Sequence, residues 1–409
     1  MKSYLTLIRS EWRLLLFGFV MMFGSSLGQT YFIGLFSGEI RSDLGLSHGA
    51  LGGIYSAATL TSAVLLLWTG SLVDRMDLRH LAYCVAVGLA FGCLLMALSH
   101  GVIMLFISML VLRHLGQGLM SMTGATTMVR YLDHQKGKAN ALGGMGYSLS
   151  EALLPMLVIA LLTVLGWRLS WVFWGLLLVT LVPLFSWRLL QGHEVRHAAY
   201  LKSVEGRAGS EHYAARKQWT RAEVVRDPYF YLFLPVLLAQ PMLFTGFMFH
   251  QVHLVEYKGW PLAIWGSIYL LYALVSTLCK LWTGILIDRV SAISIVPLMS
   301  LPFCLGLVLL AASDGLWAAV AFMVTMGITL GVYSTISSPF FSEMYGTLHL
   351  GSIKSVTTAA MVFASAIAPV LMGWLIDAGI SMDTMAIGSA AYIIVASAAA
   401  ALAVRGASK

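Results

Sequence analysis

Charged residues are scarce in this chain of 409 residues, because Asp, Glu, Lys and Arg together make up only 11% of it. An ordinary soluble domain carries about 25%. Hydrophobic residues make up 59%. So few charges cannot cover a water-facing surface, and we infer that lipid surrounds most of the side chains. The composition therefore excludes a soluble multidomain protein, a disordered chain and a coiled coil.

Cysteines are also few, and the motifs of several enzyme classes are missing. The four cysteines lie in apolar runs without Cys-x-x-Cys spacing, which predicts neither disulfides nor a zinc site. The sequence has no P-loop, no His-Glu-x-x-His and no nucleophile elbow, so we expect no ATP-driven pump, no enzyme and no cofactor. The net charge is +7, but no basic run alternates with aromatic residues, and nucleic-acid binding is not expected.

Long apolar segments are what the sequence has in abundance. Each is near the ~20 residues that a helix needs to cross a bilayer, and far longer than the ~10-residue strands of a membrane barrel. We therefore predict an all-α membrane protein with twelve transmembrane helices. The predicted spans are 14–38, 48–73, 79–99, 101–130, 139–165, 169–188, 229–255, 261–287, 292–312, 316–342, 352–377 and 384–404.

The loops between these spans indicate the orientation in the membrane. If the N-terminus is cytoplasmic, 20 of the 25 Lys and Arg residues fall on the cytoplasmic side. That asymmetry follows the positive-inside rule. We expect a multi-pass protein of the inner (plasma) membrane with both termini in the cytoplasm.

One long polar stretch, 191–228, interrupts the series of spans. It mixes both signs of charge and lacks a run apolar enough for a core, so we predict a cytoplasmic linker. It would join a first six-helix half, 1–190, to a second, 229–409. Near its end, Thr220-Arg-Ala-Glu223 predicts a capping box at the start of a short helical turn.

An internal repeat relates the two halves. Residues 67–75 read LWTGSLVDR and residues 281–289 read LWTGILIDR, an offset of 214. The same offset, without gaps, pairs Tyr55 with Tyr269 and Pro155 with Pro369. Both copies lie on the predicted cytoplasmic side, so the repeat is parallel, about an axis along the membrane normal. We predict two pseudo-symmetric six-helix bundles.

Two motifs carry a resemblance to a known family. The loop Gly70-Ser-Leu-Val-Asp-Arg-Met-Asp-Leu-Arg79 resembles the signature between helices 2 and 3 of the major facilitator superfamily, although Asp77 and Leu78 stand where Gly and Arg are usual. Arg113-His-Leu-Gly-Gln-Gly118 resembles that family's helix-4 signature. The resemblance covers essentially the whole chain. It implies a monomeric secondary transporter that works by alternating access.

The two copies of Asp-Arg suggest a conformational latch. Asp74 can face a helix N-terminus near Gly351, and Asp288 one near Lys138, in one conformation only. The alternative is that these charges are solvated topology signals. The candidate latch residues are Asp74, Arg75, Arg79, Asp288 and Arg289.

A weaker resemblance points to the bacterial monocarboxylate-transporter-like branch of the family. The segment around 24–40 in the first span is one part of it. Lys280-Leu-Trp-Thr-Gly284 resembles the Arg-x-x-x-Gly of that branch's helix 8, whose Arg binds the substrate carboxylate. Ser276 replaces the usual Asp one turn earlier, and Tyr31 stands where animal members carry Lys.

Charges inside the spans need a reason, because one at the bilayer centre costs about 2.5–3.5 kcal/mol on insertion scales. Arg113 lies near the middle of the fourth predicted span and Glu151 near the middle of the fifth. These spans form a tight hairpin, so we expect the two side chains to pair or to share a polar cavity. Two interpretations stay open: a proton switch at Glu151, and a static ion pair.

Other polar groups have two interpretations each. Lys280 would attract an anionic substrate, or its long stem would extend to the interface. His250 and His253 share a helix face near Glu256, so a metal site is conceivable. Because no further ligand follows at helical spacing, we interpret them as an interfacial polar cap and expect no metal.

These observations combine into a functional prediction. Two cations and one carboxylate inside the membrane favour a small organic anion, such as a monocarboxylate, moved together with a proton and bound between the halves. One alternative is a proton-driven exporter of hydrophobic or cationic compounds, and another is a sensor or assembly factor with a transporter-like fold. The predicted substrate-binding residues are Gln29, Tyr31, Arg113, Gln117, Lys280 and Tyr333, with Glu151 as the proton carrier.

Overall fold

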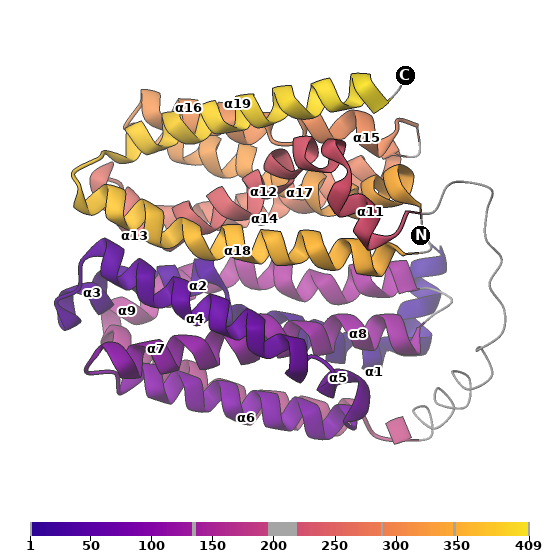
Figure 1. Ribbon diagram of the computed structural model, residues 1–409. Coiled ribbons are helices and arrows are strands. Elements are labelled where there is room, and N and C mark those ends of the chain that lie inside the picture. Colours follow the sequence, from indigo (N-terminus) through magenta and orange to yellow (C-terminus); the bar gives the residue numbers. More distant parts are fainter. Residues whose placement is uncertain (1, 133–135, 195–218, 288, 347–348, 408–409) are drawn as a thin grey trace. The chain divides into compact units, whose positions relative to one another are not determined.

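A computed structural model describes residues 2–132, 136–194, 219–287, 289–346 and 349–407 (Figure 1). Every regular element in these ranges is a helix. Ten helical segments are long and apolar enough to span a membrane. The segment Lys138–Leu189 is 52 residues long and contains two spans, and the first helix supplies the remaining one. The predicted twelve-helix membrane fold is thus confirmed.

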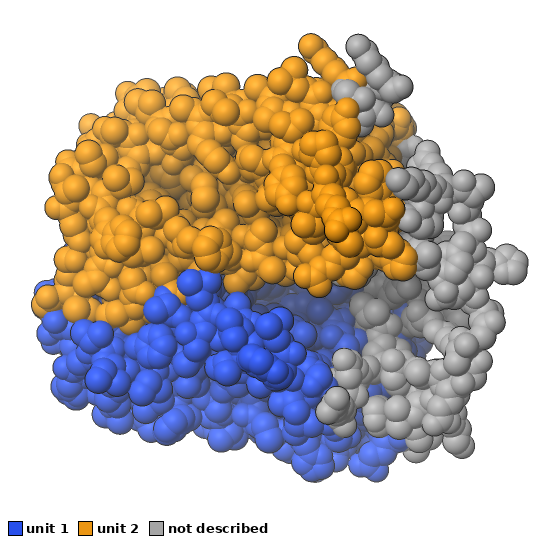
Figure 2. Space-filling model, in the orientation of Figure 1, with its two compact units in different colours: residues 1–44, 57–212 blue, residues 45–56, 213–409 orange. Residues whose placement is uncertain are grey.

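The chain forms two compact units (Figure 2). Unit 1 comprises residues 1–44 and 57–212, and unit 2 comprises residues 45–56 and 213–409. The first turns of one helix, α4 (His48–Thr69), therefore belong to unit 2. Within the predicted linker, residues 195–218 lie outside the described part of the chain.

Unit 1 contains the first six spans, except for the first turns of the second. The first span is α1 (Lys2–Gly24), the 3-10 helix η1 (Ser25–Gly28) and α2 (Thr30–Gly34), followed by α3 (Ser37–Leu44). The next elements are α4 (His48–Thr69), α5 (Leu72–Arg75) and α6 (Leu78–Ala97). The fourth span is α7 (Val102–Val111), the π-helix η2 (Leu112–Met120) and α8 (Ser121–Tyr131), and α9 (Lys136–Leu189) holds the fifth and sixth.

Two features of these helices follow from single residues. Within α9, Gly166 has a positive φ of 68°, and this conformation divides the element into spans 136–165 and 167–189. The first helix begins at Lys2, well before the predicted start at 14, with non-helical dihedral angles at Glu11. The helix therefore extends beyond the predicted span 14–38, because the charged residues before 14, unfavourable in lipid, still form helix.

Unit 2 contains the last six spans. The chain enters it through α11 (Arg221–Arg226), and then forms α12 (Pro228–Phe249), α13 (Gln251–Tyr257) and α14 (Leu262–Ile287). The ninth span is α15 (Ala292–Ile295), η4 (Val296–Leu298) and α16 (Leu301–Ala312). The last three are α17 (Leu316–Tyr345), α18 (Leu350–Asp377) and α19 (Met382–Ala407).

The entry into unit 2 contains the predicted capping box. The Thr220 hydroxyl accepts the Glu223 amide at 3.4 Å, and the Glu223 carboxylate accepts the Thr220 amide at 2.7 Å. The box is therefore confirmed. One helix later, Asp227 caps α12 by accepting the Tyr229 amide at 3.1 Å, and its other oxygen accepts the Tyr345 hydroxyl at 3.0 Å. These bonds attach the polar entry segment to the unit 2 helices.

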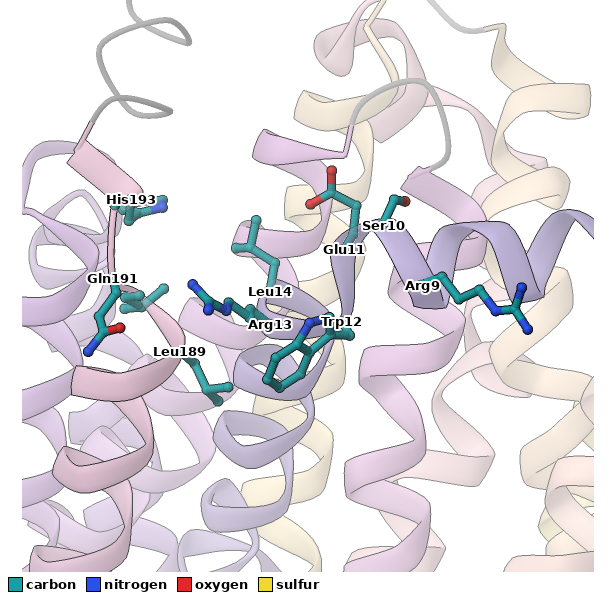
Figure 3. A pocket seen from close by; sticks show the side chains of 11 residues that line it. Arg9, Ser10, Glu11, Trp12, Arg13, Leu14, Leu189, Gln191 and His193 are labelled. Atoms are coloured by element: carbon teal, nitrogen blue, oxygen red, sulfur yellow. The ribbon is translucent and has the colours of Figure 1, made fainter.

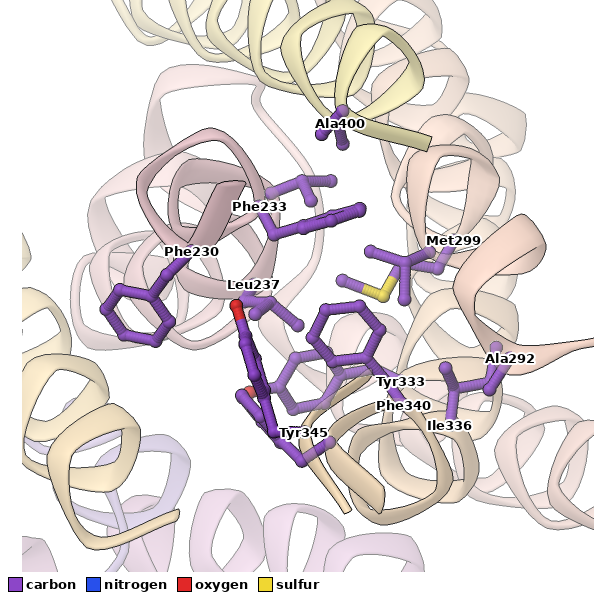
Figure 4. Packing of buried hydrophobic residues seen from close by; sticks show 14 of the residues in the cluster. Phe230, Phe233, Leu237, Ala292, Met299, Tyr333, Ile336, Phe340, Tyr345 and Ala400 are labelled. Atoms are coloured by element: carbon purple, nitrogen blue, oxygen red, sulfur yellow. The ribbon is translucent and has the colours of Figure 1, made fainter. Parts of the chain in front are cut away.

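A large apolar core lies at this end of unit 2 (Figure 4). It combines side chains of α12, α17 and α19, among others. The rings of Phe233 and Phe340 meet edge to face at a centroid distance of 5.0 Å. Aromatic rings prefer this edge-to-face contact to a direct face-to-face stack, so the pair adds to the stability of the core. Tyr333, a predicted substrate-binding residue, is part of this core.

Candidate functional site

A π-helical segment in the fourth span carries the buried cation of unit 1. The segment η2, Leu112–Met120, includes Arg113, whose side chain is only 2% exposed. A π-helix inserts an extra residue per turn and is found frequently at functional sites. It moves the Arg113 side chain out of the register that an ordinary α-helix would give it.

The first span is broken opposite this segment. After the 3-10 turn η1, Gln29 adopts an extended conformation (φ −84°, ψ 153°) before α2 begins. The break makes the Gly28 carbonyl available, and it accepts a hydrogen bond from Arg113 Nη1 at 2.9 Å. The Thr59 hydroxyl on α4 accepts one from Arg113 Nε at 3.1 Å. Irregular backbone is tolerated at membrane depth when protein buries it in this way.

Two glycines permit this close contact. A methyl group added at Gly28 would lie 2.2 Å from the Leu112 carbonyl oxygen, and one added at Gly116 would lie 2.8 Å from the Gly28 Cα. No side chain fits between these backbones. The Gly in the Arg-His-Leu-Gly motif of helix 4 therefore has a steric role: it brings the broken helix within reach of Arg113.

The buried carboxyl group of unit 1 lies in the same polar cluster. Glu151 on α9 is 1% exposed. Tyr147, one turn earlier, is hydrogen-bonded to Glu151 and lies within electrostatic reach of Arg113. Ser150 bonds to Ser26 of the broken helix and accepts the Tyr31 hydroxyl at 3.3 Å.

We call the buried polar set around Arg113 and Glu151 the unit 1 polar cluster. Its members share contacts with the interrupted part of the first span, on one side toward η2 and on the other toward α9. The structure thus brings together the two ionisable residues and one predicted wall residue, Tyr31. The set consists of Ser26, Gly28, Tyr31, Thr59, Arg113, Tyr147, Ser150 and Glu151.

The other predicted substrate-binding residues lie at different places. Gln29 is at the break itself and Gln117 is within η2, and both are partly buried. Lys280 lies on α14 of unit 2 and is also partly buried. Tyr333 on α17 is 8% exposed, and its hydroxyl lies 3.2 Å from the Met361 sulfur within the apolar core. Its surroundings are those of a packing residue.

The predicted latch residues are only partly described. Asp288 and the side chains of Asp74 and Arg75 lie outside the described part of the chain, and Arg289 is exposed. Arg79 donates Nη2 to the Leu190 carbonyl at 2.8 Å and lies 3.9 Å from the Glu194 carboxylate. Arg79 therefore caps the C-terminal end of α9 within unit 1, a contact that the sequence motif did not suggest.

Asp77, which departs from the family pattern, has a local role. Its carboxylate accepts the backbone amides of Arg79 at 3.0 Å and His80 at 3.2 Å. These are the bonds of a helix N-cap, here at the start of α6. Asp in place of the usual Gly therefore gives this helix a side-chain cap.

The histidines form a cluster inside unit 2. The His48 ring lies 4.3 Å from that of His253 and 5.7 Å from that of His250, centroid to centroid. His250 Nε2 lies 2.8 Å from the Pro369 carbonyl oxygen. Among the described residues, no group of three or more His, Cys, Asp or Glu side chains could hold a metal ion.

Sequence reasoning missed Gly28, Thr59 and the Ser26–Ser150 contact. Their roles depend on how neighbouring helices pack, which a single sequence does not give. One signal was available: Ser25-Ser-Leu-Gly28 places three weak helix formers, two Ser and one Gly, close together in an apolar span. Such a cluster favours an interruption.

The fold is that of a helical membrane protein with ionisable residues buried within its spans, and in membrane proteins such residues are rare and commonly mark substrate or ion pathways. Residues 18–369 match the model of the Major Facilitator Superfamily. The chain belongs to that family, and it is a multi-pass secondary transporter rather than an enzyme.

Solved structures support the same fold. A crystal structure of the nucleoside transporter NupG is 13% identical, with a TM-score of 0.71, 97% of this chain covered and 99% of that chain covered. A bacterial homolog to the human lysosomal transporter Spinster, crystallised inward-facing and unoccupied, is 14% identical, with a TM-score of 0.67 and 96% of each chain covered. No curated protein sequence matches this chain.

Proposed function

We propose that this transporter moves a small organic anion of the monocarboxylate type together with a proton, by alternating access. The observation that carries the proposal is the buried guanidinium of Arg113 in one cluster with the buried carboxyl of Glu151. A guanidinium has five N–H donors in a planar fork that matches a carboxylate. Two of its hydrogen bonds go to the neutral oxygens of Gly28 and Thr59, which add no competing negative charge.

Glu151 supplies the coupling in this proposal. When a carboxylate substrate approaches Arg113, a proton taken up by Glu151 keeps the net charge of the cluster unchanged. Tyr147 is hydrogen-bonded to Glu151 and lies within electrostatic reach of Arg113. A constant net charge matters because moving an uncompensated charge through the low-dielectric interior is costly.

The test uses purified protein in proteoliposomes. Labelled monocarboxylates are offered with and without an imposed pH gradient. We expect Glu151→Gln to abolish pH-driven accumulation while counterflow exchange continues, because the variant mimics a permanently protonated carboxyl group. Unchanged pH-driven uptake in Glu151→Gln would refute the role of Glu151.

The alternative is a proton-driven exporter of hydrophobic or cationic compounds. There Glu151 would bind the cation directly, and replacing it with Gln would abolish counterflow of the cation. The same proteoliposomes, offered a cationic dye and a nucleoside besides the acids, separate the possibilities. Counterflow with the dye or the nucleoside but with no acid would exclude the organic anion as substrate.

A further inference from the structure

A polar cavity of about 320 Å³ lies in unit 1 where α1 begins and α9 ends (Figure 3). Its walls come from residues 9–14 of α1 and from residues 189–193. It is separate from the unit 1 polar cluster, with which it shares no residue. The lining includes two cations, Arg9 and Arg13, and one carboxylate, Glu11.

Arg13 is the cation that faces the cavity. Figure 3 shows its guanidinium extending toward Gln191, whereas Arg9 points away. The Arg13 guanidinium also lies 5.6 Å from the centre of the Trp12 ring. In the part of the chain that the structure describes, no carboxylate lies within ion-pair distance of Arg13. The cavity therefore offers a charged donor with a hydrogen-bonding amide opposite, which suits a phosphate group.

One apolar groove adjoins this cavity, and a second adjoins the first groove along the same helix. One, of about 330 Å³, shares Trp12 with the polar cavity and is lined by α1 together with Leu142 and Met145 of α9. The other, of about 210 Å³, shares Phe19 with the first groove and lies between α1 and the sixth span, near Trp174 and Phe185. A polar compartment followed by two apolar grooves has the form of a headgroup and two acyl chains.

The start of α1 also has the character of an interfacial helix. Leu5, Ile8 and Trp12 are 53%, 40% and 49% exposed, and Leu5 and Ile8 share one side of the helix at i,i+3 spacing. Arg9 and Arg13 accompany them. Exposed aliphatic and Trp side chains beside basic residues are typical of a helix that lies in the headgroup region of a bilayer.

We propose that this cavity and its grooves bind one diacyl lipid with an anionic phosphate headgroup. The phosphate accepts hydrogen bonds from Arg13, one acyl chain lies in the groove beside Met145, and the other lies in the groove beside Trp174. An anionic headgroup is favoured over a zwitterionic one because Arg13, which faces the cavity, and Arg9 beside it together outnumber the one carboxylate of the lining, Glu11. The lipid would thus bind along α1, the helix that leads into the broken segment at Gly28.

The experiment is native mass spectrometry of the full-length transporter with added dioleoyl phosphatidylglycerol, dioleoyl phosphatidylcholine or glycerol 3-phosphate. We expect the protein to retain phosphatidylglycerol preferentially. Arg13→Gln should lower the bound fraction about tenfold, the loss expected for one charge-assisted contact. Arg221→Gln, an exposed arginine on α11 of unit 2, is the matched control and should change nothing.

A second pair of variants tests the acyl grooves. Met145→Trp fills the first groove and should weaken retention of phosphatidylglycerol, whereas Met156→Trp, exposed on the same element outside either groove, should not. Equal retention of both lipids, or equal losses in Arg13→Gln and Arg221→Gln, would overturn the proposal. Binding of glycerol 3-phosphate as tightly as the lipid would replace it with a free phosphoester site.

Discussion

The two copies of the internal repeat keep the same helices but use them differently. At the offset of 214, Arg113 of η2 corresponds to Gly327 of α17, and Glu151 of α9 corresponds to Ser365 of α18. A methyl group added at Gly327 would lie 2.9 Å from the Tyr272 carbonyl oxygen, so that position serves tight contact with α14. Ser365 donates to its own helix, at the Val362 carbonyl.

The two units therefore differ in what their repeat-related helices do. In unit 1, the π-helix η2 and the broken first span hold the buried charge of Arg113. In unit 2, α17 is the counterpart of the span that contains η2, and it is a continuous α-helix that packs by its glycines. The two copies of the six-helix repeat thus share helix lengths, directions and turn motifs, but they differ in the side chains that they bury. The two ionisable residues of the unit 1 polar cluster therefore have no ionisable counterpart at the repeat-related positions of unit 2.

The most severe way to break this comparison is Arg113→Met. We expect it to lower transport about 100-fold, because it removes the charged donor for the substrate. Thermal stability should fall little, since the insertion cost of the charge, about 2.5–3.5 kcal/mol, is removed as well. Counterflow and thermal melting check both. Arg113→Lys, which keeps the charge without the planar fork, should recover part of the activity, and substantial transport by Arg113→Met would contradict the assignment.

The glycine contacts provide the next test. Gly28→Ala forces a methyl group against the Leu112 carbonyl oxygen at 2.2 Å, and overpacking of this kind costs about 1–3 kcal/mol. Gly327→Ala meets its neighbour at 2.9 Å and should cost less. We expect Gly28→Ala to lower both the melting temperature and transport, because the acceptor of Arg113 shifts. Gly284→Ala, with open space around it, is the control and should not destabilise the protein.

Charges at the ends of the helices extend the comparison outside the membrane. In unit 2, the Lys258 side chain is 0% exposed and lies 2.7 Å from both Asp314 and Asp383. In unit 1, the ion pair between Arg168 and Asp43, also 2.7 Å apart, is 30% and 43% exposed. Ion pairs that are exposed contribute about 0–1 kcal/mol, and charged bonds from a buried group contribute more.

Replacing each cation should therefore have unequal effects. We expect Lys258→Met to lower the melting temperature by about 2–4 °C and Arg168→Met by less. Circular dichroism during heating in detergent measures both. If Arg168→Met destabilises as much as Lys258→Met, burial is not what distinguishes the two pairs.

The Lys258 contacts also predict a pH dependence. Burial alone would lower the pKa of this ammonium group, but the hydrogen bonds and charges of Asp314 and Asp383 outweigh burial and raise the pKa above its ordinary value. A raised pKa in the folded state stabilises the protein below the unfolded value of about 10.4, and this contribution is lost as the pH rises through the folded pKa. Lys258→Met should remove that alkaline loss, and an unchanged alkaline profile would refute the prediction.

These contrasts show what a sequence of this kind reveals. Twelve spans follow from long apolar runs, and the repeat LWTGxLxDR gives the relation between the halves. Arg113 and Glu151 stand out because charge is rare in lipid. By contrast, the Gly28 carbonyl, the Thr59 hydroxyl and the π-helical register of η2 depend on the packing of three helices, and local sequence does not determine that packing.

The smallest expected effect concerns the helix caps, one in each unit. Asp77 caps α6 in unit 1, and Thr220 caps α11 in unit 2. Asp77→Ala should cost about 1 kcal/mol, because two backbone amides lose their acceptor, whereas Asp77→Gly, the residue usual in the family, should cost only a few tenths. Thr220→Ala should cost about as much as Asp77→Ala, but locally, because α11 is short and lies at the entry to unit 2.

Amide hydrogen exchange distinguishes these effects. Faster exchange should be confined to residues 78–81 in Asp77→Ala and to residues 221–224 in Thr220→Ala, since each cap serves the first turn of its own helix. Faster exchange throughout unit 1 in Asp77→Ala would mean that the carboxylate holds more than a helix end. The departure from the family motif would then have a role in the loop between α5 and α6 beyond capping.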